Sequence, residues 1–151
     1  MSKSTSQSLI NQLNALLSLE HGSLIRHLSE AQPHISVRTW QAWNELSSLE
    51  EHRLFRVGLL SNILVENLNA QPLPVVFEQT VGFAHFLTLD AWLPQIREEL
   101  EKTRMLLEDI LPTHDPIIDS RIQELIRLCM QDLRHIELAD KLVKETPSTL
   151  S

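Results

Sequence analysis

The chain has few of the residues that break helices or build sheets. Its 151 residues include three glycines and no tyrosine. Leucine, glutamate, glutamine and arginine, which are good helix formers, are abundant instead. The chain also has no apolar run of membrane-spanning length and no apolar core of a signal peptide. The composition therefore predicts a helical protein of the cytoplasm that has no membrane as its partner.

Cysteine and positive charge are scarce as well. A lone cysteine, Cys129, excludes an internal disulfide and fits a reducing compartment. It lies among apolar residues, so we expect a buried core residue rather than a nucleophile. The formal net charge of −7 argues against nucleic acid as the partner. The length suits one domain, residues 1–151, with flexible tails at about 1–7 and 146–151.

Apolar residues recur every three or four positions in four stretches, which is the spacing of amphipathic helices. The predicted helices cover about residues 8–31, 37–68, 89–110 and 116–145. Thr88 and Asp115 are the expected N-caps of the last two helices. Pro94 fits a helix only in its first turn, which would move the start of the third helix toward Trp92.

The connections between these helices predict the topology. The first and second helices, and likewise the third and fourth, are joined by short segments and should therefore be antiparallel neighbours. The link at 69–88 has about 20 residues, enough to run the length of the bundle. The expected fold is an all-α four-helix bundle, made of two antiparallel helix hairpins joined by one long crossover.

Acidic residues interrupt the inward stripe of three helices at similar depths. Glu20, Glu99 and Asp132 each replace an apolar residue near the middle of its helix, and His135 lies one turn beyond Asp132. Carboxylates with imidazole are ligands for iron or manganese in such bundles. The alternative is a buried polar cluster held by salt bridges without a metal.

The second helix decides between these alternatives. Its apolar face is too wide to define one inward stripe, and the inward candidates at mid-helix are His52 and Arg56, one turn apart. His52 is able to ligate a metal. The Arg56 guanidinium would instead neutralise the carboxylates without an ion, unless it extends to solvent.

The stretch LINQLNALLSLEHGSLIRHLSEA resembles the first helix of the bacterioferritin branch of the ferritin-like superfamily. The resemblance places Glu20 at a terminal iron ligand, Glu99 at the third-helix ligand, and Asp132 with His135 at the fourth-helix Glu-x-x-His. The second helix departs from the family, because neither Arg56 nor His52 begins a Glu-x-x-His. The resemblance implies iron or a similar transition metal, in a mononuclear or asymmetric site, with oxidation of Fe(II) or reaction with peroxide as the activity. The family's haem-ligand methionine has no counterpart, so we expect no haem.

Other predictions concern assembly and the remaining histidines. A hemerythrin-like ligand set is disfavoured, because the second, third and fourth helices lack its His-x-x-x-Glu and His-x-x-x-His spacings. His27 lies on the first stripe, either as a residue that supports a metal ligand or as a core histidine. Trp40, Trp43 and the apolar connector 74–87 offer more hydrophobic surface than one bundle covers. We therefore expect a homodimer or higher oligomer, with the connector or the second helix at its interface.

Overall fold

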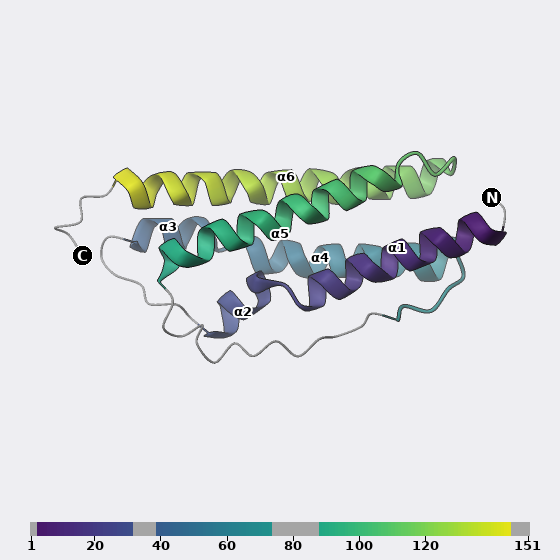
Figure 1. The fold of residues 1–151 in the computed structure, drawn as a ribbon, viewed down its shortest axis with the longest axis horizontal. Coiled ribbons are helices and arrows are strands. Elements are labelled where there is room, and N and C mark those ends of the chain that lie inside the picture. Colours follow the sequence, from purple (N-terminus) through teal and green to yellow (C-terminus); the bar gives the residue numbers. More distant parts are fainter. Residues whose placement is uncertain (1–2, 32–38, 74–87, 146–151) are drawn as a thin grey trace.

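The computed structural model describes residues 3–31, 39–73 and 88–145. Every regular element in these ranges is a helix, as the composition predicted. The elements are α1 (Lys3–His21), α2 (Leu24–Ala31), α3 (Trp40–Glu45), α4 (Leu49–Asn62), a turn of π-helix η1 (Ile63–Asn67), α5 (Leu89–Ile110) and α6 (Pro116–Glu145). They form four rods: α1 with α2, α3 with α4 and η1, α5, and α6 (Figure 1).

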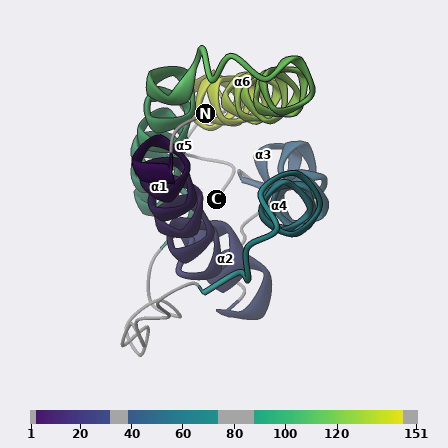
Figure 2. The ribbon, with the colours of Figure 1, turned by 90° about the vertical axis from the view of Figure 1, so that its right-hand side faces the viewer.

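The four rods pack as a bundle in which neighbours run in opposite directions. Figure 2, which looks along the bundle, shows α1 beside α5 on one side and α4 beside α6 on the other. α4 and α5 run in the same direction (Figure 1), so η1 ends at the end of the bundle opposite to the start of α5. The two hairpins and the long connection between them follow the predicted order. The connector at 74–87 lies outside the described residues.

The first two predicted helices are each interrupted. The first breaks at Gly22 and Ser23, where the Ser23 hydroxyl accepts a hydrogen bond from the N–H of Ile25 and so caps α2. The second breaks at residues 46–48, which separates α3 from α4. At the N-terminus α1 begins at Lys3, so residues 3–7, expected in a flexible tail, are helical. Residues 1–2 and 146–151 lie outside the described part.

The last two helices follow the prediction more closely. Asp115 caps α6, because its Oδ1 accepts hydrogen bonds from the N–H groups of Ile117 at 2.9 Å and Ile118 at 3.3 Å. The predicted range of α5 is confirmed, and the alternative start nearer Trp92 was wrong: the helix begins at Leu89, and Pro94 lies inside it on the exposed side. Thr88 occupies the N-cap position, but its side chain makes no capping hydrogen bond.

The core consists of two apolar clusters placed end to end. One packs α2 and α3 against the start of α5 and the end of α6, around Trp92, Ile96 and Ile136. The other packs α1 against the end of α4, the end of α5 and the start of α6, around Leu13, Leu60 and Ile122. Along α1, α4 and α6 the clusters are separated by buried charged side chains. This central layer is the candidate site.

Candidate functional site

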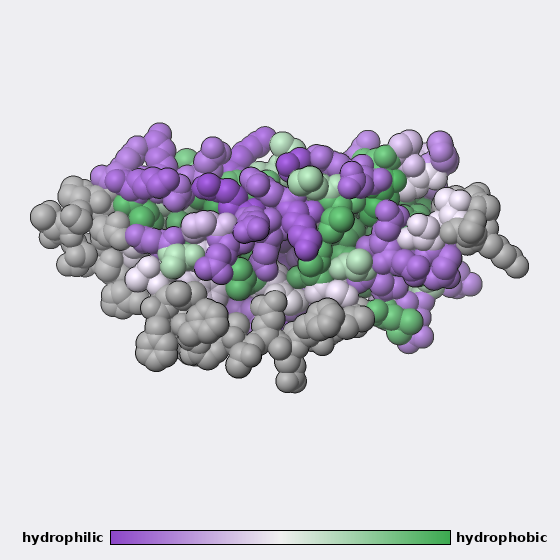
Figure 3. All heavy atoms as spheres, viewed as in Figure 1, coloured by the Kyte–Doolittle hydropathy of each residue, from purple (hydrophilic) through white to green (hydrophobic). Residues whose placement is uncertain are grey.

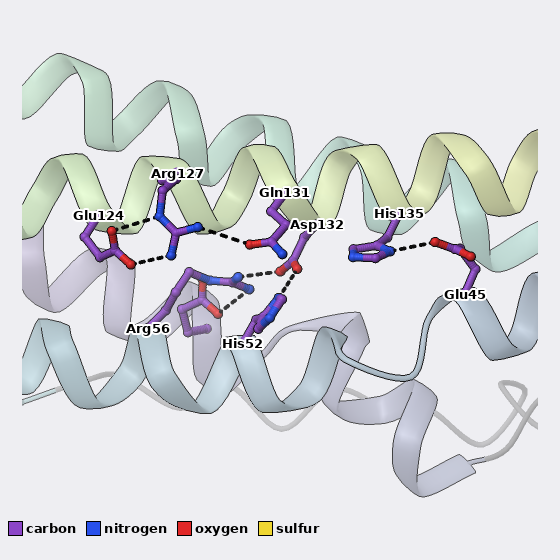
Figure 4. A network of polar contacts seen from close by, with 9 residues as sticks. Glu45, His52, Arg56, Glu124, Arg127, Gln131, Asp132 and His135 are labelled. Atoms are coloured by element: carbon purple, nitrogen blue, oxygen red, sulfur yellow. Dashed lines mark hydrogen bonds and ion pairs between the residues drawn. The ribbon is translucent and has the colours of Figure 1, made fainter.

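The layer is built around Arg56, whose side chain is 1% exposed. Its Nε donates to Glu20 Oε1 at 2.9 Å and its Nη2 to Glu20 Oε2 at 3.4 Å. Its Nη1 donates to Asp132 Oδ2 at 2.6 Å. One guanidinium therefore bridges a carboxylate of α1 and a carboxylate of α6. Figure 4 shows Arg56 and its contact with Asp132. We call Glu20, His52, Arg56 and Asp132 the central charge layer.

His52 completes the layer from the solvent side. It lies one turn before Arg56 on α4, and its Nδ1 is 2.5 Å from Asp132 Oδ1. An ionised carboxylate only accepts, so the Nδ1 of His52 carries the hydrogen and donates it. Each Asp132 oxygen thus has one donor from α4 (Figure 4). This satisfies a carboxylate that is fully buried.

A second arginine supports the layer from the same helix. Arg53 forms a two-pronged pair with Glu50, at 2.7 and 2.6 Å. Its Nη1 also donates to the backbone carbonyl of Glu20 at 2.9 Å. That carbonyl lies in the last turn of α1 and also accepts a hydrogen bond from the N–H of Ser23 at 3.3 Å. Arg53 therefore ties the end of α1 to α4 just where Glu20 enters the core.

Burial and ion pairing act against each other in the layer. Burial raises the pKa of the Glu20 carboxyl, although the Arg56 guanidinium opposes this shift. Burial alone would lower the pKa of Arg56, but the adjacent carboxylates outweigh it and raise that pKa. Arg56 is therefore permanently cationic. Burial also raises the pKa of the nearby Cys129 thiol to about 12, consistent with an inert core residue.

Two predicted ligands lie apart from Asp132 and Arg56. His135 points toward α3, where its Nδ1 is 2.8 Å from Glu45 Oε1 (Figure 4). Glu99 accepts two hydrogen bonds from the N–H of Leu24, at 2.9 and 3.2 Å, and so binds the first turn of α2. His27 is half-buried on α2, and its Nδ1 has no hydrogen-bond partner among the described residues.

Sequence reasoning missed Arg53 and Glu45. The spacing of Glu50 and Arg53 is that of an ion pair on one helix face, so this pair could have been predicted from the sequence. The role of Glu45 could not have been predicted in this way, because its contact with His135 depends on the break that follows α3. Glu99 was expected beside the other ligands. Its bond to Leu24 exists only because α2 begins there.

The donor set of the layer is compatible with a metal only if Arg56 moves. In the described ranges no group of three or more His, Cys, Asp or Glu side chains is arranged to hold a metal ion. The physical reason is that guanidinium N–H groups occupy the lone pairs of Glu20 and Asp132 that would face an ion. The layer as it stands can hold helices together and keep two carboxylates neutralised without water.

A cavity of about 240 Å³ adjoins the layer. It lies between the break that joins α1 to α2, the middle of α4 and the middle of α5. Glu20 and Arg56 line its inner side, and Glu99 also lines it. Burial raises the pKa of the Glu99 carboxyl to about 7, which the N–H of Leu24 only partly offsets.

Comparison of the chain with family models, with curated proteins and with solved structures gives no match. The resemblance to bacterioferritins therefore stays a prediction from the residues quoted above. Within the described ranges, no helix has the length and apolar character needed to cross a membrane.

Proposed function

We propose that this chain is a ferritin-like bundle that works without a metal, as a helical module for association with other copies of itself. The observation that carries this proposal is the position of Arg56, with one carboxylate on each side. A guanidinium with two carboxylates satisfies the charges that a metal cation would otherwise balance. The order and direction of the helices support the ferritin-like part of the proposal.

Elemental analysis tests the metal-free part. The protein is purified without a metal-affinity tag and compared with Asp132→Ala, His52→Ala and His135→Ala. We expect much less than one equivalent of any transition metal in all four proteins. One equivalent in the unsubstituted protein that is lost on Asp132→Ala would contradict the proposal.

Transition-metal binding is the second candidate function, with iron as the metal that the resemblance implies. The observation in its favour is that Glu20 and Asp132 both pair with Arg56, and that His52 forms a hydrogen bond with Asp132. If Arg56 left the layer, two carboxylates and an imidazole would remain, which are iron ligands. Arg56→Ala should then bind one equivalent of Fe(II). Calorimetry that detects no gain in Fe(II) binding would remove this candidate.

The outer face of α4 supports the association part of the proposal. Six exposed residues follow this face at intervals of three or four positions, apart from the adjacent Leu54 and Phe55, and the face continues into η1: they are Glu51, Leu54, Phe55, Gly58, Asn62 and Val65. Leu54, Phe55 and Val65 are each more than half exposed. α4 lies on the side away from the viewer in Figure 1, and Figure 2 shows no other described helix outside it. The face shown in Figure 3 is largely polar, with its main apolar patch where α5 passes α1.

Gly58 indicates the kind of partner that this face accepts. A Cβ built on it meets no atom within 4 Å, so packing inside the subunit does not require a glycine. Glycine in a helix costs about 1 kcal/mol relative to alanine, but it lets another helix approach closely. Gly58 is the midpoint between Glu51 and Val65 and between Leu54 and Asn62. A two-fold axis through it would pair these positions between two antiparallel copies.

Light scattering at micromolar concentration tests self-association. We expect a dimer for the unsubstituted chain and a monomer for Phe55→Lys. Ile117→Lys is the matched control, because Ile117 is equally exposed but lies at the start of α6. A monomer in the unsubstituted protein, or dissociation by both substitutions alike, would overturn this part of the proposal.

A further inference from the structure

The cavity beside the central charge layer has the parts of a small binding site. Part of its lining is apolar, from Leu19, Ile25 and Leu100. Its polar groups come from Ser23, Glu99 and Thr103, in addition to the Glu20–Arg56 pair. Its volume of about 240 Å³ equals that of about eight molecules of liquid water. It therefore suits a compound of a few heavy atoms rather than a drug-sized ligand.

The charges of the cavity leave one carboxylate without a cation. Glu20 is paired with Arg56. Glu99 accepts hydrogen bonds from the neutral N–H of Leu24 and forms no salt bridge with any described side chain. Lys102 also lines the cavity, but its side chain is exposed and is not within salt-bridge distance of Glu99. A ligand that places one positive charge beside Glu99 would neutralise the charge of this carboxylate.

Thr103 supplies a second polar group for a ligand. Its residue is 6% exposed, and it lines the cavity. A hydroxyl is able both to donate a hydrogen bond to a molecule in the cavity and to accept one from it. It lies one turn after Glu99 on α5. A molecule in the cavity can therefore contact the carboxylate and the hydroxyl at the same time.

We propose that this cavity binds a small primary ammonium compound that also carries a hydroxyl group. The ammonium donates to the Glu99 carboxylate, the short carbon chain packs on the apolar wall, and the hydroxyl bonds to Thr103. The proposed ligand contacts Glu99 and Thr103 and uses no atom of Asp132 or His52, although the Glu20–Arg56 pair also lines the cavity.

The test is an NMR titration of the full-length chain with 3-amino-1-propanol at pH 8. The neutral probe 1,3-propanediol has the same chain length, and propylamine lacks the hydroxyl. We expect saturable shifts of amides around the cavity with the amino alcohol, and at least tenfold weaker binding of the diol. The amino alcohol should also bind more tightly than propylamine.

Two variants assign these differences to residues. Glu99→Gln should weaken binding of both amines at least tenfold, whereas Glu98→Gln, a change at an exposed neighbour, should not. Thr103→Val should remove the preference for the amino alcohol over propylamine. The proposal is overturned if the diol binds as well as the amine, or if Glu99→Gln binds the amine normally. If Glu99→Gln does not fold, the comparison of the amino alcohol with the diol in the unsubstituted protein, together with Thr103→Val, decides the same question.

Discussion

Arg56→Met tests the central charge layer most directly. The substitution keeps a long side chain but removes the cation between Glu20 and Asp132. These two residues are 3% and 0% exposed. Breaking a buried ion pair by removing one partner costs about 3–5 kcal/mol, because the remaining charge stays buried. Folded proteins of this size are stable by only about 5–15 kcal/mol. The variant should therefore lose a large part of its free energy of unfolding.

Urea unfolding followed by circular dichroism at 222 nm measures this loss. Arg121→Met is the control, because Arg121 pairs with Glu66 in a partly exposed position, where the loss should stay below about 1 kcal/mol. Adding Glu20→Met and Asp132→Leu to Arg56→Met should recover most of the stability, since an apolar replacement of a buried ion pair is often neutral. A loss for Arg56→Met no larger than that of Arg121→Met would refute the reasoning.

Three other predictions concern single residues. Because the pKa of Glu99 is raised to about 7, its contribution to stability is complete below about pH 4.5 and is lost as the pH rises through 7. In urea unfolding, the free energy of unfolding of Glu99→Gln minus that of the unsubstituted protein should therefore rise by about 1–3 kcal/mol between pH 5 and pH 8. If this difference stays constant over that range, the raised pKa of Glu99 is contradicted. Gly58→Ala should stabilise the monomer by about 1 kcal/mol yet weaken the dimer, as seen by thermal unfolding and light scattering across concentrations. Asp115→Ala should cost about 1 kcal/mol in urea unfolding, because it removes the cap of α6, whereas the exposed Asp109→Ala should cost less.

The sequence was most informative where a local signal coincides with the tertiary structure. α6 was predicted closely, because Asp115 and Pro116 mark its start. Glu20 and Asp132 were recognised because each replaces an apolar residue on the inward stripe of its helix, and Arg56 because it is an inward candidate at the middle of the second helix. Their burial agrees with that interpretation. Periodicity alone did not reveal whether an ion or a guanidinium would lie between the two carboxylates.

The sequence was least informative where a contact depends on a helix break. His135 and Glu45 meet because α3 ends before α4 begins. Glu99 meets Leu24 because α2 begins after Ser23. Both breaks lie inside stretches whose apolar spacing continues across them, so periodicity predicted one helix in each case. The directions of His135 and Glu99 could not be predicted without the location of those breaks.

The charge layer also fixes how the helices align along their length. Leucine and isoleucine clusters on both sides of it would tolerate a shift of one helix by a turn, about 5.4 Å, because apolar contacts are not directional. The Arg56 guanidinium would not, since the same shift of α1 or α6 would leave Glu20 or Asp132 buried without a cation. The three ionised side chains therefore select a single register among the alignments that the leucine-rich stripes permit.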